Sequence, residues 1–197
     1  MIDAVKKTDD AFILIIGVSL LLLLLITAFM LYFLFRYRSG KNPVASDIRS
    51  NWKIEVLWTV LPSIIALWMF YLGWQSYLGL RQVPPGALEI DAAGMEFAWV
   101  FTYPGNKESE GVLTVPLGKP VKLNVTSLDV IHSLYIPAFR IKVDAVKNMK
   151  TYVWFFPDKA GTYVIYCAEY CGAGHADMNA ELRIVTEAEY TEWLKNL

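Results

Sequence analysis

The stretch A-F-I-L-I-I-G-V-S-L-L-L-L-L-L-I-T-A-F-M-L-Y-F-L-F, Ala11 to Phe35, contains no charged residue. A helix rises about 1.5 Å per residue, so a run of this length crosses a hydrocarbon core of roughly 30 Å with some tilt. It is longer than the apolar part of a secretory signal peptide, and no small-residue cleavage site follows it. We therefore expect a membrane-spanning helix here.

A second uncharged run extends from Val56 to Leu80, and the chain as a whole is 55% hydrophobic. These runs predict a transmembrane hairpin over residues 1–81, with helices at about 11–35 and 55–80. The intervening loop has one acidic residue, Asp47, among five basic ones: Arg36, Arg38, Lys41, Arg49 and Lys53. Because basic loops stay in the cytoplasm, we expect the N-terminus and residues 82–197 on the outer side.

Beyond the linker Q-V-P-P-G (82–86) the pattern changes to short alternating runs bounded by Gly, Pro, Asn or Asp. In Phe97-Ala-Trp99-Val-Phe101-Thr-Tyr103 every second residue is aromatic, which predicts a strand with one aromatic face. Further predicted strands are 111–115, 121–127, 151–156, 161–167 and 180–185. This spacing indicates an all-β, antiparallel sandwich or barrel, followed by a short C-terminal helix at 187–194.

The charge of the outer domain is mildly acidic. Residues 82–197 hold 10 Lys/Arg and 14 Asp/Glu, so the net charge is 10 − 14 = −4. This balance is compatible with a basic protein partner and argues against binding of nucleic acid.

The segment C-A-E-Y-C-G-A-G-H-A-D-M, Cys167 to Met178, holds both cysteines and one of the two histidines of the chain. Its glycines predict a loop that can bend the two sulfurs, the His175 ring and the Met178 thioether toward one point. His132, near another strand, can complete the set. Two thiolates, two imidazoles and a thioether form a soft ligand set that suits copper, and two bridging sulfurs can hold two copper ions.

Two other interpretations of these residues remain open. Outside the cytoplasm two cysteines usually pair, and a disulfide between Cys167 and Cys171 is geometrically possible. It would leave both histidines and Met178 without a role. Zinc bound by two cysteines and two histidines is also reasonable, although it gives Met178 no role.

The segment resembles the dicopper (CuA) motif C-x-E-x-C-x-x-x-H-x-x-M of subunit II of haem–copper cytochrome c oxidases, and S-L-D-V-I-H-S (127–133) is similar to its partner S-x-D-V-x-H-S. The resemblance covers the whole chain and implies two transmembrane helices followed by a cupredoxin-like domain. It implies that dinuclear copper (CuA) is bridged by the thiolates of Cys167 and Cys171. The terminal imidazoles would be those of His132 and His175. The axial ligands would be the thioether of Met178 and the backbone carbonyl of Glu169. It also assigns the Glu169 side chain to a Mg or Mn site at the border with subunit I.

Three further positions receive roles from this resemblance. The segment Gly94-Met-Glu-Phe97-Ala-Trp99 is similar to the family segment G-x-x-W-x-W, where electrons from cytochrome c enter. Phe97 and Trp99 are therefore candidates for electron entry. The alternative is that these rings only pack in the core. Asp129 matches an acid that helps to dock the donor. E-V-L-W-T-V-L-P, which begins at Glu55, resembles the family segment E-x-x-W-T-x-x-P, whose glutamate lies at the mouth of a proton channel. Glu55 is therefore a candidate for the entry of that channel. The alternative is a structural role, as a carboxylate favoured by the dipole at a helix N-terminus.

The resemblance implies a subunit of a terminal oxidase. Its copper centre would take electrons from a c-type cytochrome and pass them to haem in subunit I, where oxygen is reduced to water with proton pumping. Expected partners are subunit I, subunit III, the cytochrome and membrane lipid, in a respiratory, bacterial plasma membrane. One alternative is the CuA subunit of a related nitric oxide reductase. Another is a membrane-tethered copper-binding or disulfide-stabilised module without a redox partner.

The chain departs from the family pattern at two turns beside the ligands. Val146-Lys147-Asn148 stands where x-Pro-Gly is common, and Asn179 stands where proline often follows the methionine. The shape of these turns therefore has to be read from the structure.

Overall fold

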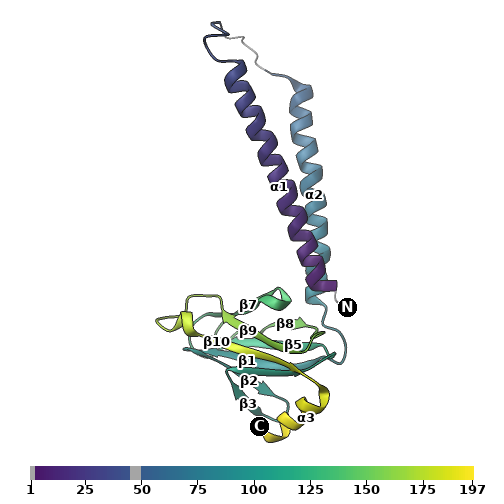
Figure 1. Ribbon diagram of the computed structural model, residues 1–197, viewed down its shortest axis with the longest axis vertical. Helices are drawn as coiled ribbons and strands as arrows, with labels where there is room; N and C mark the ends of the chain where they lie inside the picture. Colours follow the sequence, from purple (N-terminus) through teal and green to yellow (C-terminus); the bar gives the residue numbers. More distant parts are fainter. Residues whose placement is uncertain (1–2, 45–49) are drawn as a thin grey trace. The chain divides into compact units, whose positions relative to one another are not determined.

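The computed structural model describes residues 3–44 and 50–197. The chain divides into two compact units, one over Lys6–Tyr77 and one that contains Leu78–Leu197. The first unit is built from two long helices, α1 (Asp3–Arg36) and α2 (Trp52–Arg81), which form the hairpin drawn in Figure 1. Asp47 and Arg49 of the predicted basic loop lie outside the described residues.

The apolar side chains of the hairpin are exposed. Leu24, Leu67 and Phe70 are 67%, 68% and 67% exposed, and neither apolar helix segment is buried within the structure. Water would make such a surface costly, at roughly 25 cal/mol per Å² of apolar area, whereas lipid would not. The prediction of two membrane helices is confirmed, and both extend beyond the uncharged runs that predicted them.

Ten strands form a sandwich of two five-stranded sheets, which confirms the predicted all-β class. The first sheet has the order β3 (Lys107–Glu110), β2 (Ala98–Tyr103), β1 (Leu88–Met95), β5 (Val121–Ser127) and β8 (Thr151–Phe155). The second has the order β4 (Val112–Pro116), β10 (Asn179–Val185), β9 (Gly161–Cys167), β6 (His132–Ile136) and β7 (Ile141–Ala145).

Two strand pairs differ from the antiparallel expectation, because β1 pairs with β5 and β4 pairs with β10 in parallel. After β1 the chain runs through β2 and β3 and crosses to the other sheet as β4, so that β5 returns beside β1 in the same direction. Four strands, β1, β3, β6 and β7, are additional to the six that the sequence predicted.

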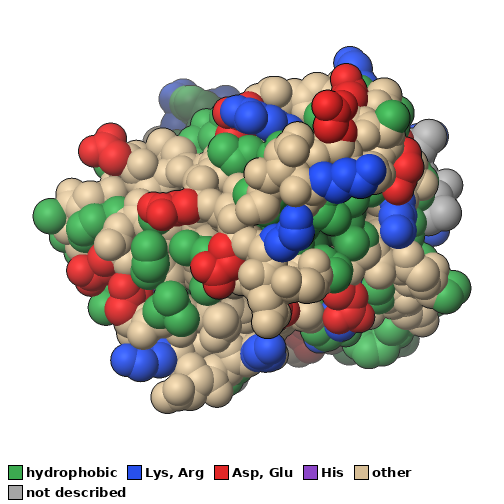
Figure 2. All heavy atoms as spheres, turned by 90° about the horizontal axis from the view of Figure 1, so that it is seen from below, with side chains coloured by type: hydrophobic (Ala, Val, Ile, Leu, Met, Phe, Trp, Pro, Cys, Tyr) green, Lys and Arg blue, Asp and Glu red, His purple; other side chains and the backbone are tan. Residues whose placement is uncertain are grey.

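The core lies between the sheets and follows the two-residue period of the strands. On β2, Trp99, Phe101 and Tyr103 are 0%, 0% and 2% exposed, which confirms the aromatic strand face. Phe97 precedes the strand and is 37% exposed. In the view of Figure 2, acidic and basic side chains are interspersed with apolar ones on the surface.

The C-terminal helix, α3 (Glu187–Asn196), is confirmed and two residues longer than predicted. Thr186 caps it: its hydroxyl accepts from the Glu189 amide, and the Glu189 carboxylate accepts from the Thr186 amide. Tyr190 is buried, and the Trp193 ring meets Tyr103 edge-on at 5.0 Å. These contacts close one side of the sandwich.

Candidate metal centre

The strand register brings three of the predicted ligands to one end of the second sheet. The Cys167 amide, at the end of β9, donates to the carbonyl of Met178, which lies just before β10, at 3.1 Å. The next amide, that of Ala168, donates to the carbonyl of Ser133 at 2.8 Å, so His132 at the start of β6 lies beside them. His132 thus begins a strand of its own, which the sequence did not predict.

Residues 168–177 form the connection between β9 and β10, here named the metal loop. It contains Cys171 and ends in the short 3₁₀ helix η2 (His175–Asp177). The turn of η2 is closed by a hydrogen bond from the Met178 amide to the His175 carbonyl at 3.3 Å. Gly172 has a φ of 135°, a conformation that favours glycine, and this lets the loop turn back toward the sheet.

The ligand atoms converge. The sulfurs of Cys167 and Cys171 are 3.8 Å apart, and both thiols are free. His132 Nδ1 lies 3.9 Å from Cys167 Sγ, and His175 Nδ1 lies 3.6 Å from Cys171 Sγ. Each sulfur therefore has its own imidazole neighbour.

Two further donors complete the arrangement. The Met178 thioether lies 3.7 Å from Cys171 Sγ, and the carbonyl of Glu169 lies 3.3 Å from Cys167 Sγ. The two weak donors thus stand beside different sulfurs.

Four of the ligand residues are shielded from water, whereas His175 is half-buried. His132 and Met178 are 0% exposed, and Cys167 and Cys171 are 8% and 6% exposed. Burial, followed by the neighbouring Cys167, raises the pKa of the Cys171 thiol to about 11. A cation that draws off this proton would make the thiolate a strong ligand in a dry site.

The donor set fits the dinuclear copper centre that the sequence suggested. A disulfide would need a sulfur–sulfur distance of about 2.05 Å, well below the observed separation. A single tetrahedral zinc ion would use the thiolates and imidazoles and leave Met178 unused, although Met178 is fully buried beside Cys171. Soft thiolate and thioether sulfur together with imidazole suits copper.

The His132 ring is held from three sides. Its Nε2 lies 2.7 Å from Asp129 Oδ1, and its ring meets Trp99 edge-on at 6.1 Å between centroids. On a third side is Gly94, where a Cβ atom would come within 2.9 Å of His132 Cδ2. Gly94 belongs to the aromatic motif, but its close contact with the His132 ring was not predicted from the sequence. The fixed spacing between this glycine and Trp99 was the one sequence signal for it.

The Asp129 carboxylate is held by hydrogen bonds from backbone amides and by its contact with His132. Its carboxylate accepts from the amides of Glu96 at 2.7 Å and Val130 at 2.6 Å, in addition to its contact with His132. Burial alone would raise the pKa of Asp129, but these hydrogen bonds outweigh it and lower the pKa to about 2. The carboxylate is therefore ionised at neutral pH.

Phe97 packs on the metal loop. A Cβ atom built on Gly174 would lie 2.5 Å from Phe97 Cδ2, and one on Gly172 would lie 3.0 Å from Phe97 Cε1. The exposed ring thus covers the glycines of the loop, whereas the Trp99 ring is buried beside His132. The two aromatic residues occupy different positions around the same cluster.

Gly174→Ala should destabilise the folded domain by about 1–3 kcal/mol, because the new methyl group overpacks the Phe97 ring. The backbone φ of Gly174 is −91°, which alanine adopts freely, so space alone decides the effect. Denaturant unfolding and the rate of copper loss to a chelator measure it. Phe97→Ala removes the obstructing ring and should suppress the penalty in the double variant. Additive effects of the two changes would contradict the proposed contact.

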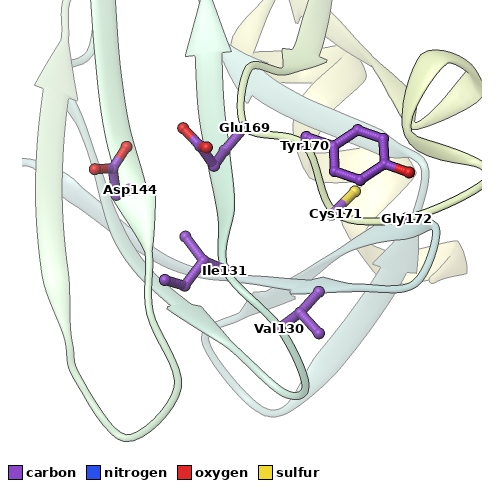
Figure 3. Close-up of a pocket in the computed structure, with 7 residues that line it drawn as sticks. All are labelled: Val130, Ile131, Asp144, Glu169, Tyr170, Cys171 and Gly172. Carbon is purple, nitrogen blue, oxygen red and sulfur yellow. The ribbon is translucent and has the colours of Figure 1, made fainter.

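Glu169 lines an open pocket beside the metal loop (Figure 3). Its carboxylate and that of Asp144 lie at one side of this pocket, with the apolar side chains of Val130 and Ile131 toward the other. Tyr170, 77% exposed, stands over Cys171. The backbone of Glu169 thus faces the cluster while its side chain belongs to the pocket.

Glu55 lies in the first turn of α2. Its carboxylate accepts from the Asn51 amide at 3.1 Å, and the Asn51 side chain accepts from the Ile54 amide at 3.4 Å. This reciprocal arrangement satisfies free amides at the helix start. Glu55 therefore caps the start of α2.

The two unusual turns are accommodated locally. Asn148, where the family pattern has glycine, takes a φ of 63°, and asparagine tolerates this left-handed conformation better than most residues. The Met149 amide closes the turn on the Val146 carbonyl at 3.2 Å. Asn179 begins β10 and pairs with Tyr166, so the departure from proline keeps the ladder intact.

Comparison with known proteins gives the same assignment over both units. The sequence matches the family described as "Cytochrome C oxidase subunit II, transmembrane domain" over residues 2–75, and that described as "Cytochrome C oxidase subunit II, periplasmic domain" over residues 105–187. It is 31% identical to alternative cytochrome c oxidase subunit 2 of Bradyrhizobium diazoefficiens, over 85% of this chain and 72% of that protein. It is 26% identical to cytochrome c oxidase subunit 2 of Thermostichus vulcanus, over 94% of this chain and 73% of that protein.

The fold is likewise similar to a solved structure. The periplasmic domain of subunit II of cytochrome oxidase (CoxB) of Bradyrhizobium japonicum matches with a TM-score of 0.57 and 31% identity, over 58% of this chain and 96% of that structure. These similarities do not favour the alternative of a nitric oxide reductase. The chain belongs to the cytochrome c oxidase subunit II family and is a membrane-bound subunit of a haem–copper oxidase, an oxidoreductase complex.

Proposed function

We propose that the chain is the electron-accepting subunit of its oxidase. It takes single electrons from a c-type cytochrome at a dinuclear CuA centre and passes them to haem in subunit I, where oxygen is reduced to water with proton pumping. The observation that carries this proposal is the pair of buried sulfurs 3.8 Å apart, each with one imidazole nitrogen beside it.

The residues of the cluster have distinct roles in this proposal. The copper pair would be held by the thiolates of Cys167 and Cys171 and the imidazoles of His132 and His175 as strong donors, with the Met178 thioether and the Glu169 carbonyl as weak ones. When bound, the copper pair supplies one-electron redox chemistry that is shared over two metals and two sulfurs. The protein packs four of the six ligand residues, His132, Cys167, Cys171 and Met178, in its interior, so little has to move when the charge changes.

The surface beside the cluster is suited to receive the electron. Phe97 is exposed and covers the metal loop, and Trp99 is buried beside His132. Asp129 retains 34% side-chain exposure and can add to the acidic surface that a basic cytochrome meets. Phe97→Ala should slow electron uptake from the cytochrome, measured in stopped flow; an unchanged rate would remove Phe97 from the route.

Full-length chain in detergent, loaded with copper, tests the central proposal. It should hold two coppers per chain and oxidise a reduced c-type cytochrome on a millisecond scale in a stopped-flow experiment. Zinc-loaded chain is the matched control, because zinc has no accessible redox chemistry. One copper per chain, or no oxidation of the cytochrome, would contradict the proposal.

The Glu169 side chain is proposed to bind Mg²⁺ or Mn²⁺ together with groups of subunit I, since carboxylate oxygen is a preferred ligand of such hard cations. Its place in an open pocket beside the copper ligands supports this role. Glu169→Gln in the assembled oxidase should lose the bound Mn²⁺ signal in electron paramagnetic resonance while both coppers remain. A retained signal would contradict the assignment.

The remaining assignments concern the complex and its orientation. We propose that subunits I and III pack against the exposed faces of α1 and α2, and that the N-terminus and residues 82–197 lie on the outer face of a bacterial plasma membrane. The predicted basic loop then lies in the cytoplasm. Protease accessibility in sealed, oriented vesicles decides this orientation, because only the outward-facing domain is cleaved.

Glu55→Ala should lower oxygen uptake and proton pumping by the assembled oxidase if Glu55 lies at the mouth of a proton channel. The same change also removes a contact that caps α2, so the amount of assembled complex must be measured alongside. Glu55→Gln is the matched variant: its amide oxygen still accepts from the Asn51 amide but cannot take up a proton. Full activity of assembled Glu55→Gln oxidase would restrict Glu55 to the capping role.

A further inference from the structure

Tyr152 of β8 contacts the last residue of α2 twice. α2 is a single helix over Trp52–Arg81, and its last turn, from Leu78, belongs to the same compact unit as the two sheets. The Tyr152 hydroxyl donates to the Arg81 carbonyl at 3.1 Å, and the Arg81 guanidinium lies 4.1 Å from the centre of the Tyr152 ring. Tyr152 therefore holds both the backbone and the side chain of one helix residue.

Each contact satisfies a need of the helix end. The last carbonyl groups of a helix have no amide donor within the helix, and the Tyr152 hydroxyl supplies a donor to one of them. A guanidinium is attracted to the negative face of an aromatic ring, and the Arg81 guanidinium has this contact with the half-buried Tyr152 ring. The two contacts together oppose unwinding of the last turn.

The Tyr152 side chain is itself held by the first sheet. It stands opposite Asn124 in the ladder between β5 and β8, and Lys122 Nζ lies 5.6 Å from the centre of its ring. Lys122 is paired with Glu89 at 3.3 Å, and Asn124 Nδ2 donates to an oxygen of Asp91 at 3.0 Å. These contacts join β8, β5 and β1, so the ring belongs to a connected polar face of the sheet.

The rest of the junction leaves the chain little freedom. Leu80 packs against the core of the sandwich, and the linker that follows contains Pro84 and Pro85, each with a fixed φ. Leu88 begins β1, and its amide donates to the Pro120 carbonyl at 2.8 Å. The chain is thus fastened to the sandwich on both sides of the linker.

We propose that Tyr152 is a positioning residue for electron transfer out of the copper centre: it locks the end of α2 onto the first sheet and so keeps the copper pair at a set distance from the haem in subunit I. The role rests on the proposed function, since it needs a copper pair that passes electrons to that haem. Where a reaction depends on position, a misplacement of about 1 Å by a remote change can cost about 100-fold in rate.

Trypsin tests the contact in the full-length chain in detergent. Cleavage after Arg81 requires the guanidinium and the following peptide bond to leave the helix end, and it yields a fragment that begins at Gln82 and is identified by its mass. Tyr152→Ala removes both contacts and should speed this cleavage about tenfold, because proteolysis follows the population of the opened form. Tyr152→Phe keeps the ring and loses the hydroxyl, so its cleavage rate should be intermediate.

Tyr163→Phe is the matched control for Tyr152→Phe. It removes a hydroxyl that likewise donates to a backbone carbonyl, that of Lys159 at 3.0 Å, but on a strand of the second sheet. Its cleavage after Arg81 should match that of the unmodified chain. Circular dichroism establishes that the sandwich of each variant is folded. Equal cleavage after Arg81 in the unmodified chain and in folded Tyr152→Ala would overturn the proposal.

The second measurement uses the assembled oxidase and follows the copper centre and the haem separately after mixing with reduced cytochrome. In Tyr152→Ala oxidase the copper should be reduced as fast as in Tyr163→Phe oxidase, whereas reduction of the haem should be slower by about tenfold or more. An unchanged rate of haem reduction would overturn the positioning role. Slowing of both steps would also overturn it, because the copper centre itself would then be affected.

Failure of the proposed function would look different. An unmodified oxidase that lacks two coppers in this chain, or whose copper takes no electron from the cytochrome, would contradict the proposed function and with it the role of Tyr152 in electron transfer. The trypsin measurement needs neither copper nor cytochrome, so it still decides whether Tyr152 holds the end of α2.

Discussion

The full-length chain with serine in place of Cys171 is expected to lose the dinuclear copper centre. Cys171 Sγ lies at the centre of one half of the cluster, with Cys167, His175 and Met178 all within 3.8 Å of it. A serine hydroxyl is a hard, neutral donor in a site built for a soft thiolate, so it is a poor replacement for a sulfur shared by two copper ions. Copper should fall from two to at most one per chain, and electron uptake from reduced cytochrome should disappear.

Metal analysis and the visible thiolate-to-copper absorption measure this outcome. Tyr170→Phe is the control, because it alters the neighbouring exposed residue and leaves every proposed ligand in place. A Cys171→Ser chain that kept two coppers and its electron uptake would show that the second sulfur is not a bridging ligand. The proposed function would then lose its central support.

Replacement of Trp99 by alanine is expected to have the largest effect on stability. Trp99 is 0% exposed, and removal of a buried aromatic ring typically costs about 3–5 kcal/mol through lost burial and the cavity left behind. This is a large share of the roughly 5–15 kcal/mol that holds a typical domain folded. The change also removes the ring beside His132, so copper should be lost more readily.

Denaturant unfolding, followed by the circular dichroism of the β-sheets, measures the loss. Trp99→Phe is the informative control, because it keeps most of the apolar volume. The Trp99 indole N–H has no hydrogen-bond partner among the described residues, so phenylalanine loses no such bond and should cost well below the alanine variant. Equal stability of Trp99→Ala and the unmodified chain would contradict a packing role for this ring.

The architecture could be predicted from the sequence wherever one local pattern dominates. Uncharged runs long enough to cross a bilayer identified α1 and α2, and the alternating aromatics identified β2. Strands β6 and β7 escaped prediction. The run His132–Ile136 is buried at nearly every position, so it lacks the alternation that marks a strand with one exposed face. The parallel pairs also escaped, because strand order depends on contacts between distant segments.

The ligand types followed from the spacing of Cys167, Cys171, His175 and Met178, since four metal-binding side chains within one short stretch of sequence are a local signal. The supporting residues around them were harder to predict. Gly94 lies against the His132 ring, and Asp129, expected to serve in docking, turns its carboxylate toward that histidine. Both contacts depend on the arrangement of strands and turns in space, which sequence spacing does not report.

By itself, then, the sequence determined that this protein has two membrane helices, an all-β domain and a set of soft donors, because burial in lipid, strand alternation and ligand chemistry are properties of neighbouring residues. Only the tertiary structure decided which donor stands beside which sulfur, how Phe97 covers the glycines of the metal loop, and which nitrogen of His132 faces the cluster. Those outcomes depend on β6, β9 and β10 meeting at one end of a sheet. Their pairing is a long-range choice made by the packing of the whole sandwich.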